Sequence, residues 1–297
     1  MNAGAPPAGM SRSGLGRFLE IQNLGLNLSF ALAFLFLAAQ GLPTARTAIL
    51  AVIAFVAARN AGHSFNRWAD RRLDAQNPRT RDRALPSGER SPAFALSFAA
   101  ANAAVVVVAA YLLNPLAFAL APVALLLVLG YSYTKRVTTL TTAFLGLVEA
   151  VTPAAVFIAV TGALPAFVLL AVGALLAWGT AFETVHSLGD VASDRALGLF
   201  SIPVRFGERA AARLVPALHA TALVLLAVFG AVLGLSLPYF VALGVMGALA
   251  AGADATLLAD PAESRGPFRR HFVLGFVYLA GVVIAVFLPS LGALPSP

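Results

Sequence analysis

The chain of 297 residues is 60% hydrophobic and only 11% charged, and its mean hydropathy is +0.86. Soluble domains carry about a quarter charged residues, so this composition excludes a soluble globular protein and predicts an integral membrane protein. The absence of cysteine excludes disulfides, thiolate metal sites and cysteine nucleophiles. The net charge of +7 could suggest a nucleic-acid partner. The basic residues are distributed as in a membrane topology, however, so we expect no nucleic acid.

Along the chain, residues 1–16 are small and rich in proline and glycine, which predicts a disordered tail before one polytopic domain over residues 17–297. Nine apolar stretches follow, each close to the roughly 20 residues that a bilayer requires. The sequence therefore predicts an all-α integral membrane protein with nine transmembrane helices. We place them at residues 23–42, 47–65, 92–113, 115–134, 139–161, 164–186, 211–234, 237–257 and 272–291.

The basic residues predict the orientation of these spans. They lie almost entirely before the first span and in the loops after the second, fourth, sixth and eighth spans. The positive-inside rule then places the N-terminus in the cytoplasm and the C-terminus outside. We expect a multi-pass protein of the plasma membrane, surrounded by the lipid bilayer, with a helical bundle around a central cavity that opens near the cytoplasmic side. No obligatory protein partner is evident from the sequence.

Two acidic stripes lie at the cytoplasmic ends of the second and sixth predicted spans. Asn66, Asp70 and Asp74 are four residues apart, as are Asp190 and Asp194, so each set lines one helix face. Like charges so placed repel each other by a few tenths of a kcal/mol, and their presence in so apolar a chain indicates a bound cation. Hard oxygen ligands suit Mg²⁺, which usually binds one or two carboxylates together with substrate phosphates. The stripes predict a membrane site for a diphosphate and its magnesium ions.

Both stripes belong to longer motifs. The first continues through residues 77–83 into Arg-Ala-Leu-Pro-Ser-Gly at 83–88, and the second into Gly-Leu-Phe-Ser-Ile-Pro at 198–203. Between them lies Tyr-Ser-Tyr-Thr-Lys-Arg at 131–136. In order, spacing and membrane side these motifs resemble those of the UbiA superfamily of intramembrane aromatic prenyltransferases.

The resemblance implies an enzyme that transfers a polyprenyl group from an allylic polyprenyl diphosphate to a ring carbon of an aromatic acceptor, with Mg²⁺ as cofactor. It implies that Asn66, Asp70 and Asp74 hold one Mg²⁺, that Asp190 and Asp194 hold a second, and that the diphosphate bridges both ions. The four aspartates are then catalytic residues as well as metal ligands.

Four basic or phenolic residues are candidates for binding the diphosphate. Arg59, Tyr131 and Lys135 match family positions that contact it, with Lys135 acting as a point charge in catalysis. Arg59 lies seven residues before Asn66 on the same helix face, and an arginine within a span normally faces a polar cavity. For Arg136, a substrate contact and a charge that only sets topology explain the residue equally well.

Ionisable residues within the fifth and sixth spans indicate function by default. Glu183 and His186 lie seven and four residues before Asp190, which makes both candidates for contacting the aromatic acceptor. For His186, as for His63 three residues before Asn66, an interhelical hydrogen bond is an equal explanation. For Glu149 in the fifth span, a functional role and a hydrogen bond from its protonated form to a neighbouring helix are equal explanations. His219 and His271 are expected to be packing residues.

The segments 59–66 and 70–74 are most similar to the bacterial quinone-pathway branch of the superfamily, which includes 4-hydroxybenzoate polyprenyltransferases and their menaquinone-pathway relatives. This implies a 4-hydroxybenzoate-like or naphthoate-like aromatic acid as acceptor, in respiratory quinone biosynthesis. One departure is Glu20, where family members often carry an arginine at the entry to the first span.

Three alternatives were weighed against this interpretation. One is a UbiA-type prenyltransferase with a different acceptor. A CDP-alcohol phosphatidyltransferase requires an Asp-Gly and an Ala-Arg ahead of its last aspartates, and neither precedes Asp70 or Asp190. An ion-coupled transporter favours charges near the middle of the membrane, whereas both stripes lie at one interface.

Overall fold

The computed structural model describes residue 18 and residues 24–288, and for residues 24–27 and 265–272 it describes the backbone alone. Within these residues the chain is helical and contains no strand, as the composition predicts. The predicted disordered tail, Glu20 and the side chain of His271 lie outside the described part. The single domain over residues 17–297 stays a prediction.

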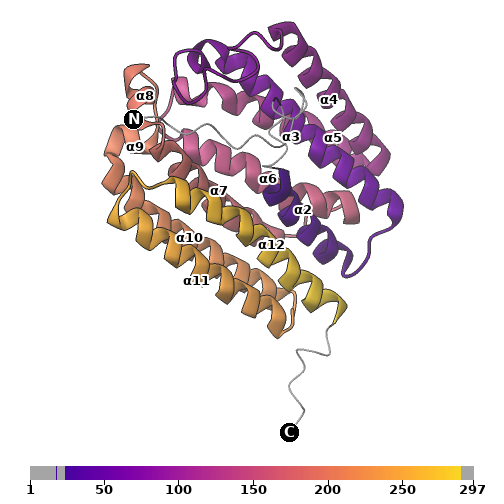
Figure 1. Cartoon of the computed structure of the whole chain (residues 1–297). Helices are drawn as coiled ribbons and strands as arrows, with labels where there is room; N and C mark the ends of the chain where they lie inside the picture. The colour runs from indigo at the N-terminus through magenta and orange to yellow at the C-terminus, as the bar shows by residue number, and fades with distance from the viewer. Residues whose placement is uncertain (1–17, 19–23, 289–297) are drawn as a thin grey trace, which may run out of the picture.

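Twelve helices make up the described chain. The long ones run side by side along one common direction, and the short helices α8 and α9 lie together at one end of the bundle (Figure 1). In chain order they are α2 (Leu24–Ala39), α3 (Ala45–Asp74), α4 (Pro92–Leu113), α5 (Pro115–Gly130), the 3-10 helix η2 (Tyr131–Arg136), α6 (Thr141–Thr161), α7 (Val168–Leu188), α8 (Val191–Ala196), α9 (Ile202–Phe206), α10 (Glu208–Val232), α11 (Leu237–Ala259) and α12 (Arg265–Phe287).

Seven helical segments among the described residues are long and apolar enough to cross a membrane: α3, α4, α5 with η2, α6, α7, α10 and α11. They match the second to eighth predicted stretches. The first and ninth stretches correspond to α2 and α12, whose apolar parts are shorter, at Leu28–Ala39 and Val273–Phe287. The protein is thus a multi-pass membrane protein with seven candidate spans, and the count of nine stays a prediction.

Short polar signals in the sequence start several of these helices. Ser91 and Asn114 each precede a proline at the first helical position. Their side chains accept hydrogen bonds from the backbone N–H groups of Phe94 (3.1 Å) and Ala117 (2.9 Å). Asn114 Nδ2 also donates to the carbonyl oxygen of Ile158 (2.8 Å), so one side chain caps α5 and ties it to α6.

Helix α7 is at the centre of the bundle. It is the most buried of the seven candidate spans, with 67% of its apolar window buried. Helix α6 packs along one side of it and α10 along another, while α11 and α12 continue from α10 towards α2. Helices α3, α4 and α5 form the opposite flank in Figure 1, and each of them contacts α6.

A buried contact between a histidine and a carboxyl group joins α10 to α11 on the flank away from α3–α5. His219 Nδ1 lies 3.0 Å from both carboxylate oxygens of Asp254, and the ring of Trp178 from α7 lies 4.9 Å from the His219 ring. Charged groups within a membrane helix are normally paired with one another, facing the bundle interior. The packing role expected for His219 is therefore confirmed, with Asp254 as its partner.

The sixth predicted span does not continue as one helix to Asp194. Helix α7 ends at Leu188, and α8 begins after the turn at Gly189 and Asp190. Glycine weakens a helix and aspartate favours the position before a new one, so the chain changes direction here. The spacing of seven residues between Glu183 and Asp190 therefore does not place them on one continuous helix. The Asp194 N–H still donates to the Asp190 carbonyl oxygen (2.8 Å), which keeps the two aspartates one helical turn apart.

Candidate active site

A cavity of about 750 Å³ runs through the flank of the bundle formed by α2 to α7. One end of it, called the acidic end below, is lined by Asp70, Asp74, Asp190 and Asp194. Away from this end the walls are mostly apolar, with side chains from α3, α4, α5 and α6 such as Phe55, Val106, Leu120, Leu145 and Val156. The cavity therefore offers a charged region and an apolar region to one elongated ligand.

The cavity brings together residues that are far apart in the sequence. All but one of the predicted site residues line it: Arg59, Asn66, Asp70, Asp74, Tyr131, Lys135, Glu183, His186, Asp190 and Asp194. The exception is Arg136, which contacts Asp70 without belonging to the cavity lining. Helix α3 runs nine residues beyond the predicted end of the second span, so Asn66, Asp70 and Asp74 lie on successive turns of one helix.

Asp70 is buried among three donors. Lys135 Nζ lies 2.6 Å from Asp70 Oδ2, and Arg136 Nη2 lies 2.9 Å from Oδ1. Asn66 Nδ2 donates a hydrogen bond to Oδ2 (3.1 Å). Arg136 also donates to the carbonyl oxygen of Ala69 (2.8 Å). The two cations of η2 thus hold this carboxylate from one side, and only Lys135 extends into the cavity.

Asp74, one turn further along α3, is held by the loop that follows it. Arg83 Nη1 lies 2.9 Å from Asp74 Oδ1, and Thr80 Oγ1 donates to the Asp74 carbonyl oxygen (3.0 Å). Arg67 Nη1 is 3.9 Å from Oδ2, which is buried and accepts no hydrogen bond from the described residues. One carboxylate oxygen of Asp74 therefore still lacks a close donor.

Across the cavity, Asp190 and Asp194 differ in their surroundings. Arg79 binds Asp190 in a bidentate manner, through Nε at 2.7 Å and through Nη2. Burial alone would raise the pKa of Asp190, but the hydrogen bonds and charge of Arg79 outweigh it and lower the pKa below its usual value. Burial and the neighbouring charge of Asp190 raise the pKa of Asp194 to about 6. Asp194 is thus the less neutralised of the pair.

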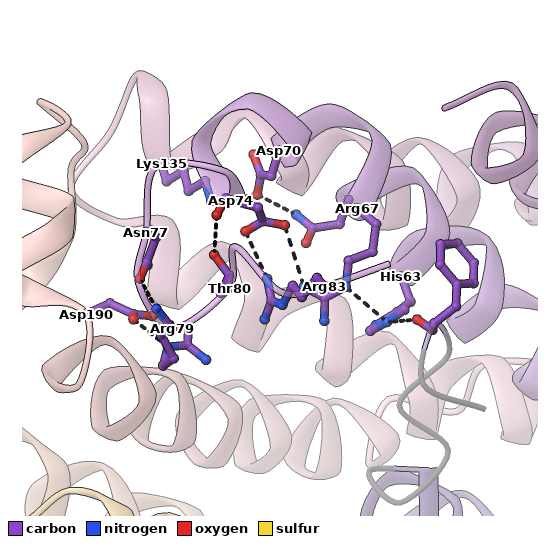
Figure 2. A network of polar contacts seen from close by, with 12 residues as sticks. His63, Arg67, Asp70, Asp74, Asn77, Arg79, Thr80, Arg83, Lys135 and Asp190 are labelled. Carbon is purple, nitrogen blue, oxygen red and sulfur yellow. Dashed lines mark hydrogen bonds and ion pairs between the residues drawn. The ribbon is translucent and has the colours of Figure 1, made fainter. Parts of the chain in front are cut away.

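The loop between α3 and α4 folds back over the acidic end, as Figure 2 shows for Asn77, Arg79, Thr80 and Arg83. The Arg79 N–H donates to Asn77 Oδ1 (2.9 Å), which fixes the turn that aims the guanidinium at Asp190. In the sequence these residues are identifiable only as the continuation of a motif, without a role of their own. The sequence did carry one signal for a role of this loop at the site, a run of arginines directly after an acidic stripe.

A further contact connects the cavity to residue 18. His63 Nε2 lies 3.0 Å from the carbonyl oxygen of Phe18 and 3.3 Å from Arg67 Nε. His63 also lines the cavity, and its contact with a substrate stays a prediction. On α7, His186 Nδ1 lies 3.4 Å from Glu183 Oε2.

The donor set fits Mg²⁺ held partly by a substrate. No group of three or more histidine, cysteine or acidic side chains within the described chain is close enough to hold a metal by itself. The carboxylates instead form two pairs facing one cavity, which suits an ion that binds one or two carboxylates plus phosphate oxygens. The unmatched Oδ2 of Asp74 and the raised pKa of Asp194 both mark carboxylates that a cation would stabilise.

The sequence matches known proteins over most of its length. The model of the UbiA prenyltransferase family matches residues 27–280. A 4-hydroxybenzoate octaprenyltransferase from Nitrosomonas eutropha is 31% identical over 251 residues, which cover 84% of this chain and 87% of the relative. Another from Shewanella amazonensis is 35% identical over 174 residues, covering 59% of this chain and 60% of the relative, so that match spans less than two thirds of either protein.

Solved structures share the fold. A UbiA homologue from Aeropyrum pernix superimposes with a TM-score of 0.81 at 29% identity, covering 89% of this chain and 98% of the other. A UbiA homologue from Archaeoglobus fulgidus, bound to DMAPP and Mg²⁺, superimposes with a TM-score of 0.73 at 17% identity, covering 93% of this chain and all of the other. The family match and the shared fold agree with the amphipathic cavity, and the chain belongs to the UbiA family of prenyltransferases.

Proposed function

We propose that this protein transfers a polyprenyl group from an allylic polyprenyl diphosphate to a ring carbon of a hydroxylated aromatic acid of the 4-hydroxybenzoate or naphthoate type, in respiratory quinone synthesis. The observation that carries the proposal is the cavity itself. Its acidic end holds four aspartates among several cations, and its remaining walls are apolar. A ligand with a diphosphate head and a long hydrocarbon tail matches both regions at once.

The residues at the acidic end suit a diphosphate bound with metal ions. In this proposal Asn66, Asp70 and Asp74 hold one Mg²⁺, and Asp190 and Asp194 hold another. Bound Mg²⁺ supplies positive charge that stabilises the diphosphate as it leaves. The support is the paired arrangement of the carboxylates, the buried Oδ2 of Asp74 that accepts no hydrogen bond from the described residues, and the raised pKa of Asp194. The relative from Archaeoglobus fulgidus was solved with Mg²⁺ and a prenyl diphosphate.

The cations that line the cavity bind the rest of the diphosphate. The cavity that contains the acidic end is also lined by Lys135, Arg59 and the phenol of Tyr131. When the bond from the prenyl C1 to oxygen breaks, the electron pair goes to the diphosphate, and fixed donors stabilise the charge that develops there. The apolar wall keeps water away from the allylic cation until the ring carbon attacks it and loses its proton.

The acceptor is proposed to lie beside Glu183 and His186. Both residues lie on α7, precede Asp190 in the chain and line the cavity. If the diphosphate occupies the acidic end, the prenyl C1 would lie beside them. Similarity to two 4-hydroxybenzoate octaprenyltransferases supports an aromatic acid as the acceptor. The arginines around the acidic end offer partners for its carboxylate.

Substitution of the aspartates tests this proposal. Asp70→Asn and Asp194→Asn are expected to abolish Mg²⁺-dependent prenyl transfer from geranyl diphosphate to 4-hydroxybenzoate in nanodiscs, because each removes charge where the metals would bind. Asp82→Asn is the matched control, since Asp82 lies exposed in the loop that covers the site. Turnover by Asp70→Asn and Asp194→Asn at the level of the Asp82→Asn protein would contradict the proposed metal site.

A further inference from the structure

Glu149 is a carboxyl group in the cavity to which the proposed reaction has so far given no role. It lies on α6, eight residues after Thr141, which places it about 12 Å along the helix from its first residue. It lines the same cavity as the acidic end and Glu183. It makes no hydrogen bond or ion pair with any residue in the described part of the chain. The interhelical hydrogen bond considered from the sequence is therefore not formed there.

The position of this carboxyl is fixed by close packing of α6 against α7. Glu149 Oε2 lies over Gly179, at 2.5 Å from the point that a Cβ on this glycine would occupy. Glu183 follows Gly179 by one helical turn and lines the same cavity. The two carboxyls thus face one region of the cavity from adjacent helices.

Polar groups within a membrane protein are expensive unless they are hydrogen-bonded. Glu149 faces the cavity, so a bound ligand is in a position to supply its partner. The same face of α6 carries a second unmatched group: Thr142 is 2% exposed, lines the cavity, and its hydroxyl oxygen has no hydrogen-bond partner among the described residues. Ser132 on η2 has the same properties, with 1% exposure.

The chemistry of the two substrates decides which of them Glu149 meets. A polyprenyl tail has no hydrogen-bond donor, and an ionised diphosphate offers only acceptor oxygens. The acceptor is different, because its ring hydroxyl donates a hydrogen bond. We propose that Glu149 determines acceptor specificity by accepting a hydrogen bond from a hydroxyl group of the aromatic ring, with Glu183 on the neighbouring helix bordering the same subsite. This inference rests on the proposed function, because it takes the aromatic substrate from it.

The orientation of the acceptor follows from the charges around it. The acidic end of the cavity carries the basic side chains Arg79, Arg83 and Lys135, whereas Glu149 and Glu183 bring carboxyl groups to the deeper region. A ring with a carboxylate at one side and a hydroxyl at the other fits with the carboxylate towards the cations and the hydroxyl towards Glu149. The reversed orientation would take the carboxylate of the acceptor away from these cations and is disfavoured.

The test compares ligands that differ only in the ability to donate a hydrogen bond. Binding of 4-hydroxybenzoate and 4-fluorobenzoate, and of 6-hydroxy-2-naphthoate and 6-fluoro-2-naphthoate, is measured by calorimetry on the protein in nanodiscs without a prenyl donor. We expect the wild type to bind the hydroxylated member of at least one pair about 3- to 10-fold more tightly, as for the gain of a single hydrogen bond. Glu149→Leu should reduce this preference to less than about twofold and leave the affinity for the fluorinated acid unchanged.

Two further variants separate recognition from folding. Glu149→Gln keeps the size of the side chain and an acceptor oxygen, so it should retain part of the preference. Glu208→Gln, at the exposed first residue of α10, should retain all of it. The proposal is overturned if the wild type shows no hydroxyl preference in either pair, or if Glu149→Leu keeps the full preference.

The outcome is distinguishable from failure of the proposed function. A hydroxyl preference that depends on Glu149, in a protein that transfers no prenyl group to either hydroxylated acid, would contradict the proposed function and leave the subsite standing. Prenyl transfer to 4-hydroxybenzoate with an acceptor KM that Glu149→Leu leaves unchanged would support the function and contradict the subsite.

Discussion

At the scale of single residues, Lys135 and Arg136 show that two adjacent cations can have different tasks. Both contact Asp70, but Arg136 also donates to the Ala69 carbonyl oxygen and lies over the ring of Tyr133. Its guanidinium is therefore engaged on the outer side of α3. Lys135 has a flexible stem, lines the cavity and is the only lysine in the sequence. Of the two, Lys135 is the one whose side chain can move to a ligand by giving up only its contact with Asp70.

This difference predicts how Lys135 responds to the donor. Reductive ¹³C-methylation labels Lys135 and the N-terminus and keeps the charge of the amine. The methyl signal of Lys135, assigned by its loss in Lys135→Arg, is expected to shift on addition of geranyl diphosphate with Mg²⁺, because the ammonium exchanges Asp70 for a diphosphate oxygen. Geraniol with Mg²⁺ is the control and should leave it unchanged. An unchanged signal at saturating geranyl diphosphate would remove Lys135 from the diphosphate site.

The same residue predicts a kinetic result. Lys135→Met should lower kcat/KM for the prenyl diphosphate about 10- to 100-fold, which corresponds to the loss of one charge-assisted contact. The KM for the aromatic acceptor should change by less than twofold. Steady-state kinetics with each substrate varied at saturating levels of the other measures both constants. An effect confined to the acceptor KM would show that Lys135 serves the other substrate.

At the scale of helices, two glycines set the distance between α6 and α7. A Cβ on Gly146 would lie 2.7 Å from the backbone nitrogen of Thr180 and 2.8 Å from the carbonyl oxygen of Leu176. A Cβ on Gly179 would lie 2.9 Å from the Cα of Gly146. Small residues allow such close approach of membrane helices, where van der Waals packing drives association. This contact positions Glu149 beside the turn of α7 that carries Glu183.

Enlarging this contact should therefore be destabilising. Gly146→Ala is expected to lower the free energy of unfolding by about 1–3 kcal/mol, because backbone atoms cannot yield as a flexible side chain does. Gly244→Ala on α11 is the matched control: nothing lies within 4 Å of its added Cβ, and alanine is the better helix former by up to about 1 kcal/mol. Thermal unfolding of both variants in the same detergent compares them. Equal midpoints would show that α6 and α7 are further apart than described.

At the scale of the whole molecule, the cavity is built by the first two thirds of the chain. Among the described residues, its lining begins at Phe30 and ends at Ser201. Helices α10, α11 and α12 pack behind α7, and none of their described residues lines the cavity. They complete the bundle that supports α7, which carries Glu183 and His186. The acidic end, the loop between α3 and α4, and helices α8 and α9 all lie at one end of this bundle (Figure 1).

The membrane orientation of this end can be tested by reporter fusions. Fusions after Gly88 and Gly207 are expected to report cytoplasmic locations, and fusions after Gly162 and Pro297 external ones, because the loops at the acidic end carry most of the basic residues. Paired cytoplasmic and external reporters at each site serve as internal controls. A cytoplasmic C-terminus would mean that α12 does not cross the membrane.

Hydropathy and motif spacing in the sequence determined the membrane class, the helical fold, the positions of seven candidate spans and the residues that line the acidic end. These features are local, because a span is a run of apolar residues and a stripe is a four-residue repeat. The sequence also indicated Glu149 as an ionisable residue in a span, without deciding what it contacts.

Only the tertiary structure decided which distant groups meet. Arg79 reaches Asp190 across 111 positions because the loop after α3 folds back over the cavity, and no periodicity encodes that path. Gly189 and Asp190 carry a local signal for the break after α7, but the direction that α8 takes beyond it is decided by the tertiary structure. The place of Glu149 over Gly179 depends on the rotation of two packed helices about their axes. Such contacts arise from the packing of the whole bundle, so a single sequence does not reveal them.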